Sequence, residues 1–280
     1  MQRIFVGDVQ GCADELDEVI ERAERVFGRR FELWLVGDAI NRGPANLRVL
    51  RCVRERVEAG RAQLVLGNHE IAFLECAFGL RALRAADTFG DLLDAPDVDD
   101  WVDWLRSRPL VVRGRMNRQP FAMVHAATHP GWSLRELARQ ASRVQGALSG
   151  PRGAARAFLA GRRGRRKRDV LARLTNCRSV DGDAWSANVP QGRYVPWHAA
   201  WSQEKHGYGV VYGHWSLQGL HVAHGLRGLD TGCVHHGRSG RRWLTAWVPD
   251  ARRHRPFDVP YRARDFWKVP ARRAYFEDAR

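Results

Sequence analysis

Short apolar runs alternate with helical stripes over the first quarter of the chain. The runs are Ile4–Val6, Leu33–Val36 and Leu64–Leu66, and each has the length of a buried strand. Between them, residues 12–27 and 46–57 carry apolar side chains at helical spacing. Strands that alternate with helices are typical of a parallel sheet. Residues 2–66 therefore predict a strand–helix–strand–helix–strand unit.

The pattern changes in the rest of the chain. Residues 70–108 and 133–160 predict mainly helices, whereas residues 176–206 show no clear period and are expected to be irregular. Alternating apolar positions predict further strands at 109–112, 121–124, 208–212, 219–223, 226–229 and 242–248.

No clean linker separates two parts of the chain, so we expect one α/β domain over residues 1–280. Helical insertions at about 70–108 and 133–206 are expected to cover a pocket. The polar segment 251–280, rich in Pro and Arg, is expected to form a surface tail.

Polar side chains with metal-binding atoms follow the predicted strands. The residues at these strand ends are Asp8, Gln10, Asp38, Asn68, His69, His125 and His214. Ligands of α/β proteins gather outside the carboxyl ends of the strands. Carboxylate, amide and imidazole groups without a thiolate suit Mn²⁺, Fe²⁺, Co²⁺ or Zn²⁺. The sequence therefore predicts a metal-dependent enzyme that acts on phosphates.

The charge of the chain favours polyanionic partners. Lys and Arg number 46 against 31 Asp and Glu, which gives a net charge of +15. The run Arg162–Arg168 concentrates this charge, and three hypotheses stay open for it: a solvated loop, a patch that steers polyphosphate, or an arm that contacts RNA.

The five cysteines stand at positions 12, 52, 76, 177 and 233. They form no CxxC pair, so a zinc site built on thiolates is not expected, and free thiols in a reducing compartment are the simplest interpretation. No apolar run approaches 18 residues, and the first strand begins within four residues of the start. We expect a cytoplasmic protein without a membrane partner, and the oligomeric state stays open.

Five blocks of sequence resemble a known superfamily, the calcineurin-like metallophosphoesterases. The blocks are Gly7–Gly11, Gly37–Gly43, Gly67–Glu70, Val124–Ala126 and Tyr212–Trp215. Within the superfamily, four segments are most similar to the bacterial symmetrical bis(5′-nucleosyl)-tetraphosphatases. These segments are Gly7–Cys12, Asn41–Pro44, Gly213–Trp215 and Leu229–Val234. The resemblance covers residues 1–150 and 208–250 well and residues 151–206 poorly.

The resemblance implies a four-layer α-β-β-α sandwich of two mixed β-sheets with a helical cap insertion. It also implies two divalent metal ions, with Mn²⁺ favoured and Co²⁺, Fe²⁺ or Zn²⁺ left open. The first ion would be held by Asp8, Gln10 and Asp38. Asp38 would bridge to the second ion, which Asn68, His125 and His214 would complete.

The resemblance also implies the residues that contact substrate. His69, oriented by a carboxylate, would act as a general acid or a phosphate donor, and Arg42 would bind the phosphate with its planar guanidinium. Arg178 is a further candidate for phosphate binding. Gln10 departs from the superfamily pattern, which usually has a histidine there, so a weaker first metal site is expected.

The implied reaction is hydrolysis of diadenosine tetraphosphate to two ADP by a metal-bridging hydroxide. Two other enzymatic activities stay open: a protein Ser/Thr phosphatase, and an enzyme that removes nucleoside-tetraphosphate caps from RNA 5′ ends. A catalytically weak RNA-binding protein is the non-enzymatic alternative. Capped RNA 5′ ends therefore join dinucleoside polyphosphates as candidate partners.

Several other residues have less definite roles. Glu70 is interpreted as a carboxylate at a helix start without a catalytic role, and Asp230 as either support for a metal-bound histidine or part of a turn. Trp185, Trp197 and Trp201 are candidates to stack on a nucleobase, although packing is an equally good interpretation. His235 and His236 are candidates to lie near the pocket.

Overall fold

The computed structural model describes residues 1–235, 242–250 and 252–276. His236, which the sequence places near the pocket, lies outside these residues, as do residues 251 and 277–280 of the expected tail. Among the helices within the described ranges, none is both long and apolar enough to span a membrane.

The first sheet has the strand order β13-β12-β1-β2-β3. Its strands are β1 (Gln2–Val6), β2 (Phe31–Leu35), β3 (Ala62–Leu64), β12 (Trp243–Trp247) and β13 (Phe266–Pro270). The strands β1, β2 and β3 are parallel, and β12 runs antiparallel to both β1 and β13. The predicted N-terminal unit is confirmed, and its three strand ends lie at one edge of this sheet.

The second sheet has the strand order β10-β11-β9-β5-β4. Its strands are β4 (Val111–Met116), β5 (Gln119–Val124), β9 (Gly209–Tyr212), β10 (His221–Ala223) and β11 (Leu226–Gly228). The neighbours β5, β9 and β11 are parallel. The carboxyl ends of β5 and β9, which precede His125 and His214, therefore lie side by side.

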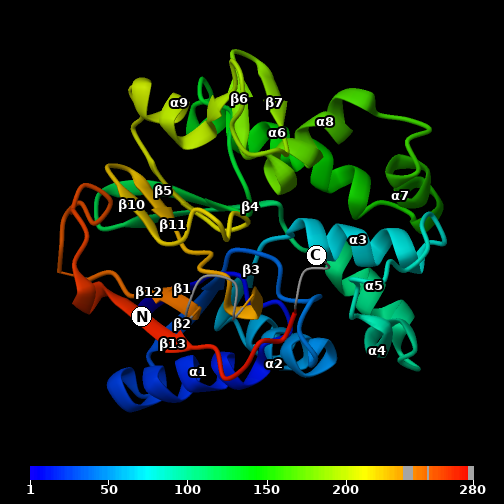
Figure 1. The fold of residues 1–280 in the computed structure, drawn as a ribbon, viewed down its shortest axis with the longest axis horizontal. Helices are drawn as coiled ribbons and strands as arrows, with labels where there is room; N and C mark the ends of the chain where they lie inside the picture. Colours follow the sequence, from blue (N-terminus) through cyan, green and yellow to red (C-terminus); the bar gives the residue numbers. More distant parts are fainter. Residues whose placement is uncertain (236–241, 251, 277–280) are drawn as a thin grey trace.

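Alternating side chains join the two sheets and the outer helices. In β1, Ile4 and Val6 pack on the helical side of the sheet, while Phe5 faces the second sheet. In β2, Leu33 and Leu35 pack on the helical side and Trp34 faces the second sheet. The rings of Phe5 and Trp34 both contact Phe121 of β5. Figure 1 shows the two stacked sheets, with α1 (Ala13–Phe27) and α2 (Asn46–Glu58) on the outer side of the first.

The remaining helices extend from the second sheet and from the loops around the strand ends (Figure 1). They are α3 (Asn68–Ala77), α4 (Gly90–Leu93), α5 (Val98–Arg106), α6 (Leu134–Leu148), α7 (Arg152–Leu159), α8 (Arg165–Asn176) and α9 (Trp197–Gln203). Short 3₁₀ turns occur at η1 (Cys233–His235) and η2 (Ala263–Asp265). The expected α-β-β-α sandwich of two mixed sheets is confirmed.

Two expectations about where regular secondary structure is absent were wrong. The segment 176–206, expected to be irregular, contains α9 and a third sheet with the order β7-β6-β8. The strands of this sheet are β6 (Ser179–Asp181), β7 (Ala184–Ser186) and β8 (Val195–Pro196), each too short to show a period in the sequence. The expected surface tail contributes β13, whose register with β12 makes it an edge strand of the first sheet.

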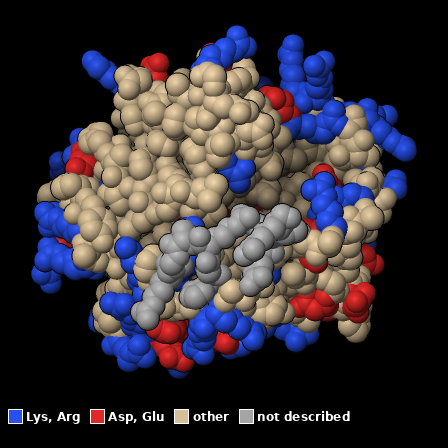
Figure 2. Space-filling view, in the orientation of Figure 1, with Lys and Arg blue, Asp and Glu red and all other residues tan. Residues whose placement is uncertain are grey.

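The basic run begins in a turn and continues into the first residues of α8, where Arg165, Arg166 and Lys167 are exposed. On the face in Figure 2, Lys and Arg side chains are distributed around the periphery, with Asp and Glu among them along the lower edge. The positive charge of this face is therefore not confined to one stripe.

Candidate metal centre

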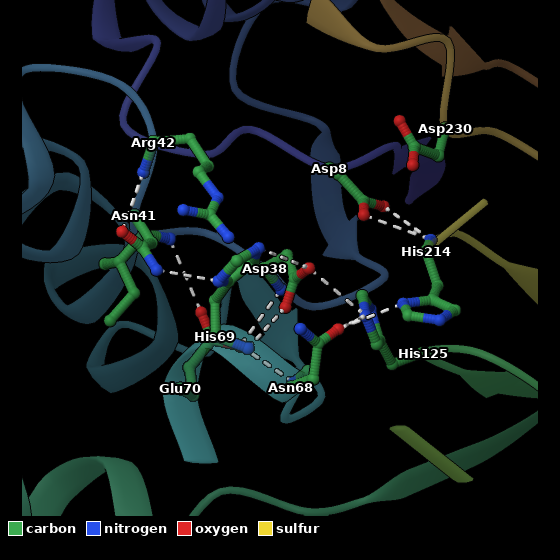
Figure 3. Close-up of polar contacts among 12 residues, drawn as sticks. Asp8, Asp38, Asn41, Arg42, Asn68, His69, Glu70, His125, His214 and Asp230 are labelled. Carbon is green, nitrogen blue, oxygen red and sulfur yellow. Dashed lines mark hydrogen bonds and ion pairs between the residues drawn. The ribbon is translucent and has the colours of Figure 1, made fainter. Parts of the chain in front are cut away.

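Five polar side chains from five loops meet at the strand ends (Figure 3). Asp8 follows β1, Asp38 follows β2, Asn68 begins α3, His125 follows β5 and His214 follows β9. Four of the five are buried, with exposed fractions between 0% for His125 and 9% for His214. Parallel strands from both sheets thus bring the predicted ligands to one place.

Two glycines make this convergence sterically possible. A Cβ atom at Gly67 would overlap Oδ1 of Asp38, and a Cβ atom at Gly213 would overlap Oδ1 of Asp8. Both carboxylates therefore lie directly against the backbone of a neighbouring loop. Any larger residue at either glycine would displace a carboxylate from the site.

Backbone conformation also distinguishes this site. Among the described residues, six that are not glycine have positive φ, and five of them belong to the site loops: Gln10, Asp38, Asn41, Arg42 and His214. Such conformations are costly for residues with a side chain and cluster at functional sites. Contacts with the rest of the fold therefore hold these loops in backbone conformations that their residues do not favour locally.

The hydrogen bonds of His125 and His214 show which nitrogen of each ring carries the proton and which carries a lone pair. His125 Nδ1 lies 2.9 Å from the carbonyl oxygen of Val36, and His214 Nε2 lies 3.0 Å from that of Asn176. A carbonyl oxygen only accepts, so each of these nitrogens carries the proton in a neutral ring. The opposite nitrogens, His125 Nε2 and His214 Nδ1, then present lone pairs to the site.

Those lone pairs face other acceptors. His125 Nε2 lies 3.1 Å from Asn68 Oδ1 and 3.3 Å from Asp38 Oδ2, and His214 Nδ1 lies 2.9 Å from Asn68 Oδ1. Lone pairs of imidazole, amide and carboxylate groups at these distances repel one another unless a cation lies among them. The donor set of one carboxylate, one amide oxygen and two imidazoles therefore fits a divalent metal ion.

The charges of the site support the same conclusion. Burial, together with the nearby carboxylates of Asp230 and Asp38, raises the pKa of Asp8 well above its ordinary value. Burial likewise raises the pKa of Asp230 to about 6, with a further contribution from Asp38. Burial opposes ionisation of Asp38 as well, but His125 and His69 hold its pKa below the ordinary value. Crowded, buried carboxylates of this kind are stabilised by bound cations.

His69 is held by an amide, not by the carboxylate that we expected. Its Nδ1 lies 2.8 Å from Nδ2 of Asn41, whose Oδ1 accepts the backbone N–H groups of Arg42 and Thr88 at 2.9 Å. Because that oxygen accepts two hydrogen bonds, the other amide atom is the nitrogen and donates to His69. His69 is therefore a neutral ring whose proton is on Nε2, 3.7 Å from Asp38 Oδ2.

Glu70 has a larger structural role than its position at a helix start indicated. Its carboxylate is fully buried and accepts backbone N–H groups from Gly67 at 2.7 Å, Asp38 at 2.9 Å and Ala39 at 2.8 Å. A fourth donor is the N–H of Ile40, at 3.4 Å. Glu70 therefore joins the loop that carries Asp38 to the loop that carries Asn68.

The structural roles of Glu70 and Asn41 could be predicted only in part from the sequence. Glu70 stands at the third helical position after Gly67, where a glutamate closes a capping box. Asn41 lies within the block Asn41–Pro44, but its contact with His69 joins loops 28 positions apart and has no local pattern.

Comparison with known proteins places this geometry in a family. The family model described as calcineurin-like phosphoesterase matches residues 1–148, which include the first four ligand-bearing loops. The chain belongs to this family.

Curated relatives of the phosphoesterase extend the match over most of its length. A protein from Janthinobacterium sp. (strain Marseille) named symmetrical bis(5′-nucleosyl)-tetraphosphatase is 35% identical, over 85% of this chain and 91% of its own. A protein of the same name from Ralstonia nicotianae is 34% identical, over 83% and 86% of the two chains.

Solved structures agree on the fold of the phosphoesterase. A protein proposed to be a diadenosine tetraphosphatase has a TM-score of 0.62 at 23% identity, over 96% of this chain and 93% of its own. A protein serine/threonine phosphatase from Saccharomyces cerevisiae has a TM-score of 0.53 at 12% identity, over 100% and 81%. At these identities the likeness concerns the fold alone.

The other predicted site residues of the phosphoesterase lie around the same centre. The backbone of Gln10 donates to the Asp38 carbonyl at 2.8 Å, which fixes one loop against the other. Arg42 points toward His69 in Figure 3 and lowers the pKa of that ring, after the larger effect of burial. Arg178 interacts electrostatically with Asp230, Asp38 and Asp8. Their roles toward metal and substrate stay predictions.

The Gln10→His substitution is expected to tighten the first of the two predicted metal sites, because neutral imidazole is a better ligand for a transition-metal ion than an amide oxygen. The measurement is a calorimetric titration of the metal-free protein with Mn²⁺. Two ions per chain are expected in both proteins, and the weaker of the two dissociation constants should fall by about tenfold in the variant. A single ion per chain under saturating Mn²⁺ would contradict the two-metal expectation.

Proposed function

We propose that this phosphoesterase hydrolyses diadenosine tetraphosphate to two ADP with the help of two divalent metal ions, of which Mn²⁺ is favoured. The observation that carries the proposal is the similarity, at 35% identity over 85% of the chain, to a curated symmetrical bis(5′-nucleosyl)-tetraphosphatase. A metal centre with the nearby arginines Arg42 and Arg178 suits a reaction that depends on positioning and on charge stabilisation.

The residues of the centre divide into metal-binding and substrate-binding groups. Asp8, Gln10 and Asp38 would hold one ion, and Asp38, Asn68, His125 and His214 the other. When bound, two such ions polarise the phosphoryl oxygens and activate water at neutral pH. Glu70 keeps the loops of Asp38 and Asn68 in register.

His69 and two arginines would act on the substrate. Since Asn41 donates to Nδ1 of His69, the Nε2–H of this ring is available as a hydrogen-bond donor to a phosphate oxygen. An ADP leaving group is a weak base and needs little protonation, so a neutral donor suffices for an anhydride. Arg42 and Arg178 would bind the flanking phosphates as bidentate donors.

A cavity beside the centre offers room for a nucleoside. It has a volume of about 810 Å³, and its lining includes Arg178, Asn188, Gln191 and Trp215. Ligand pockets of this size hold drug-sized molecules. Arg178 lines the cavity and also interacts with the carboxylates of the centre, so one polyphosphate could extend from one to the other.

The tryptophan that borders this cavity differs from those singled out in the sequence. Trp197 and Trp201 are 1% and 3% exposed and belong to the core, so both are packing residues. Trp185 donates its indole N–H to Asp169 at 2.9 Å. Trp215 is therefore the candidate to stack on a nucleobase.

Product analysis tests the proposed function. The full chain is incubated with Mn²⁺ and diadenosine tetraphosphate, and the nucleotides are separated by ion-exchange chromatography. ADP is the expected sole product. ATP together with AMP would show asymmetric cleavage and overturn the proposal, as would the absence of metal-dependent turnover in protein that has bound its metal ions.

A further inference from the structure

A second group of metal-binding side chains lies outside the phosphate-hydrolysing centre. Cys12 precedes α1, Glu15 lies in the first turn of α1, and Cys233 begins the turn η1. The Sγ atoms of the two cysteines and a carboxylate oxygen of Glu15 all lie within 4.8 Å of one another. Their exposed fractions are 0% for Cys12 and Glu15 and 1% for Cys233.

Glu15 provides an independent indication of a ligand. Its Oε1 accepts the backbone N–H of Arg272 and the hydroxyl of Tyr275, both at 2.8 Å. Its Oε2 is buried and has no hydrogen-bond partner. Leaving a buried carboxylate oxygen unpaired is costly, so proteins pair such atoms or let them coordinate metals.

The cluster contains several acidic groups in close contact. The Cys12 thiol donates to the carbonyl oxygen of Gln10 at 3.8 Å, and the Cys233 thiol and the Glu15 carboxylate lie within 4.8 Å of it. Burial and the adjacent Glu15 raise the pKa of the Tyr275 hydroxyl. A cation bound among these groups would compensate the negative charge that they carry once ionised.

We propose that Cys12, Cys233 and Glu15 bind a Zn²⁺ ion at a structural site separate from the catalytic centre. Two thiolates select zinc over the hard cations that suit oxygen and imidazole ligands. In a tetrahedral zinc site, two sulfur ligands lie about 3.8 Å apart, so side-chain adjustments within the observed 4.8 Å suffice. Binding releases the two thiol protons to solvent, and a water or hydroxyl ligand completes the tetrahedron.

The zinc ion would connect three parts of the chain. Cys12 follows the Gln10 loop directly, Cys233 lies three residues after Asp230, and Glu15 is hydrogen-bonded to residues 272 and 275 near the C-terminus. The site would therefore anchor two loops of the catalytic centre and the C-terminal segment to α1. This inference does not depend on the proposed function, because it concerns a different set of ligands.

Cobalt substitution tests this site in the full chain. The protein is unfolded with a chelator and a phosphine reductant and then refolded with Co²⁺. Cobalt that is bound by thiolate gives an intense charge-transfer absorption in the near ultraviolet, whereas cobalt at the Asp, Asn and His ligands of the catalytic centre does not. We expect this band to saturate at one equivalent of thiolate-bound cobalt and to disappear when Zn²⁺ is added.

Variants locate the signal. Cys233→Ser and Cys12→Ser should each reduce the band at least fivefold, whereas Cys76→Ser, a change at a cysteine of α3 outside the cluster, should leave it unchanged. Asp38→Asn should also retain it, which separates this site from the catalytic one.

Several results would overturn the proposal. One is the absence of the charge-transfer band from the refolded wild-type chain, a result that can be interpreted without any variant. Another is persistence of the band in both serine variants. A Cys12–Cys233 disulfide as the main form of the purified protein, detected by mass spectrometry of an unreduced digest, would assign the pair to redox chemistry instead.

Discussion

Asp38→Asn is expected to lower kcat for diadenosine tetraphosphate by about a thousandfold or more, with little effect on folding. The Asp38 carboxylate faces residues of both proposed ligand sets: its Oδ2 lies 3.3 Å from His125 Nε2, and its charge raises the pKa of Asp8, after the larger effects of burial and Asp230. The asparagine retains an oxygen for the hydrogen bond from the backbone N–H of His69, which Asp38 Oδ1 accepts at 2.9 Å. It loses the negative charge, and metal-ion stabilisation of a transition state contributes several kcal/mol.

The measurement is steady-state turnover at saturating Mn²⁺, together with the metal content and the thermal unfolding of each variant. Gln10→Ala is the matched control, because Gln10 is proposed to bind only one of the two ions and its loss should cost much less activity. Similar losses in the two variants would show that Asp38 does not bridge, and retention of more than a tenth of the activity in Asp38→Asn would exclude a bridging role.

The centre could be predicted because local pattern and strand direction determine it. An apolar strand followed by a glycine and a polar residue places that residue at a strand end, and parallel strands place these ends at one edge. The pattern predicts Asp8, Asp38 and Asn68 in this way, and the structure brings their side chains together with those of His125 and His214 (Figure 3). Two glycines of these blocks have a steric role that the pattern does not show, since carboxylates lie directly against them.

The supporting contacts could not be predicted, because they join residues far apart in the sequence. Asn41 meets His69 through a side-chain hydrogen bond, and His214 is oriented by the carbonyl of Asn176, 38 positions away. Cys12 and Cys233 lie 221 positions apart, so the absence of a CxxC pair does not exclude a thiolate site in the folded chain. Spacing rules detect sites only where the ligands share a local motif.

The missed strands have the same explanation. The five residues of β13 show neither a helical nor a strand period that is distinct from the polar sequence around them. The pairing with β12 stabilises this segment as a strand. In the third sheet, β8 has two residues and β7 three, which is shorter than any window that a period requires. Tertiary pairing determines these elements more than local propensity does.

Glu70→Gln is expected to destabilise the protein by about 2–5 kcal/mol and to lower activity at the same time. The carboxylate accepts four backbone N–H groups, two on each oxygen, from the Gly67 and Asp38–Ile40 segments. Glutamine replaces one accepting oxygen with an NH₂ group that faces N–H donors, so two buried donors lose their partners. Each unsatisfied buried donor costs about 1–3 kcal/mol. Activity falls as well, because the same hydrogen bonds position Asp38 and Asn68.

Glu75→Gln on the same helix is the matched control. Glu75 is partly exposed, and its contact with Arg81 is an ion pair at 3.7 Å, so its replacement should change stability by less than about 1 kcal/mol. Urea unfolding followed by circular dichroism gives the free energy of unfolding of each variant, and turnover is measured on the folded fraction. Equal stabilities of the two variants would mean that the loops do not depend on the Glu70 carboxylate. A large loss of stability with unchanged turnover would contradict the second half of the prediction. It would mean that the metal ions, and not the hydrogen bonds of Glu70, position Asp38 and Asn68.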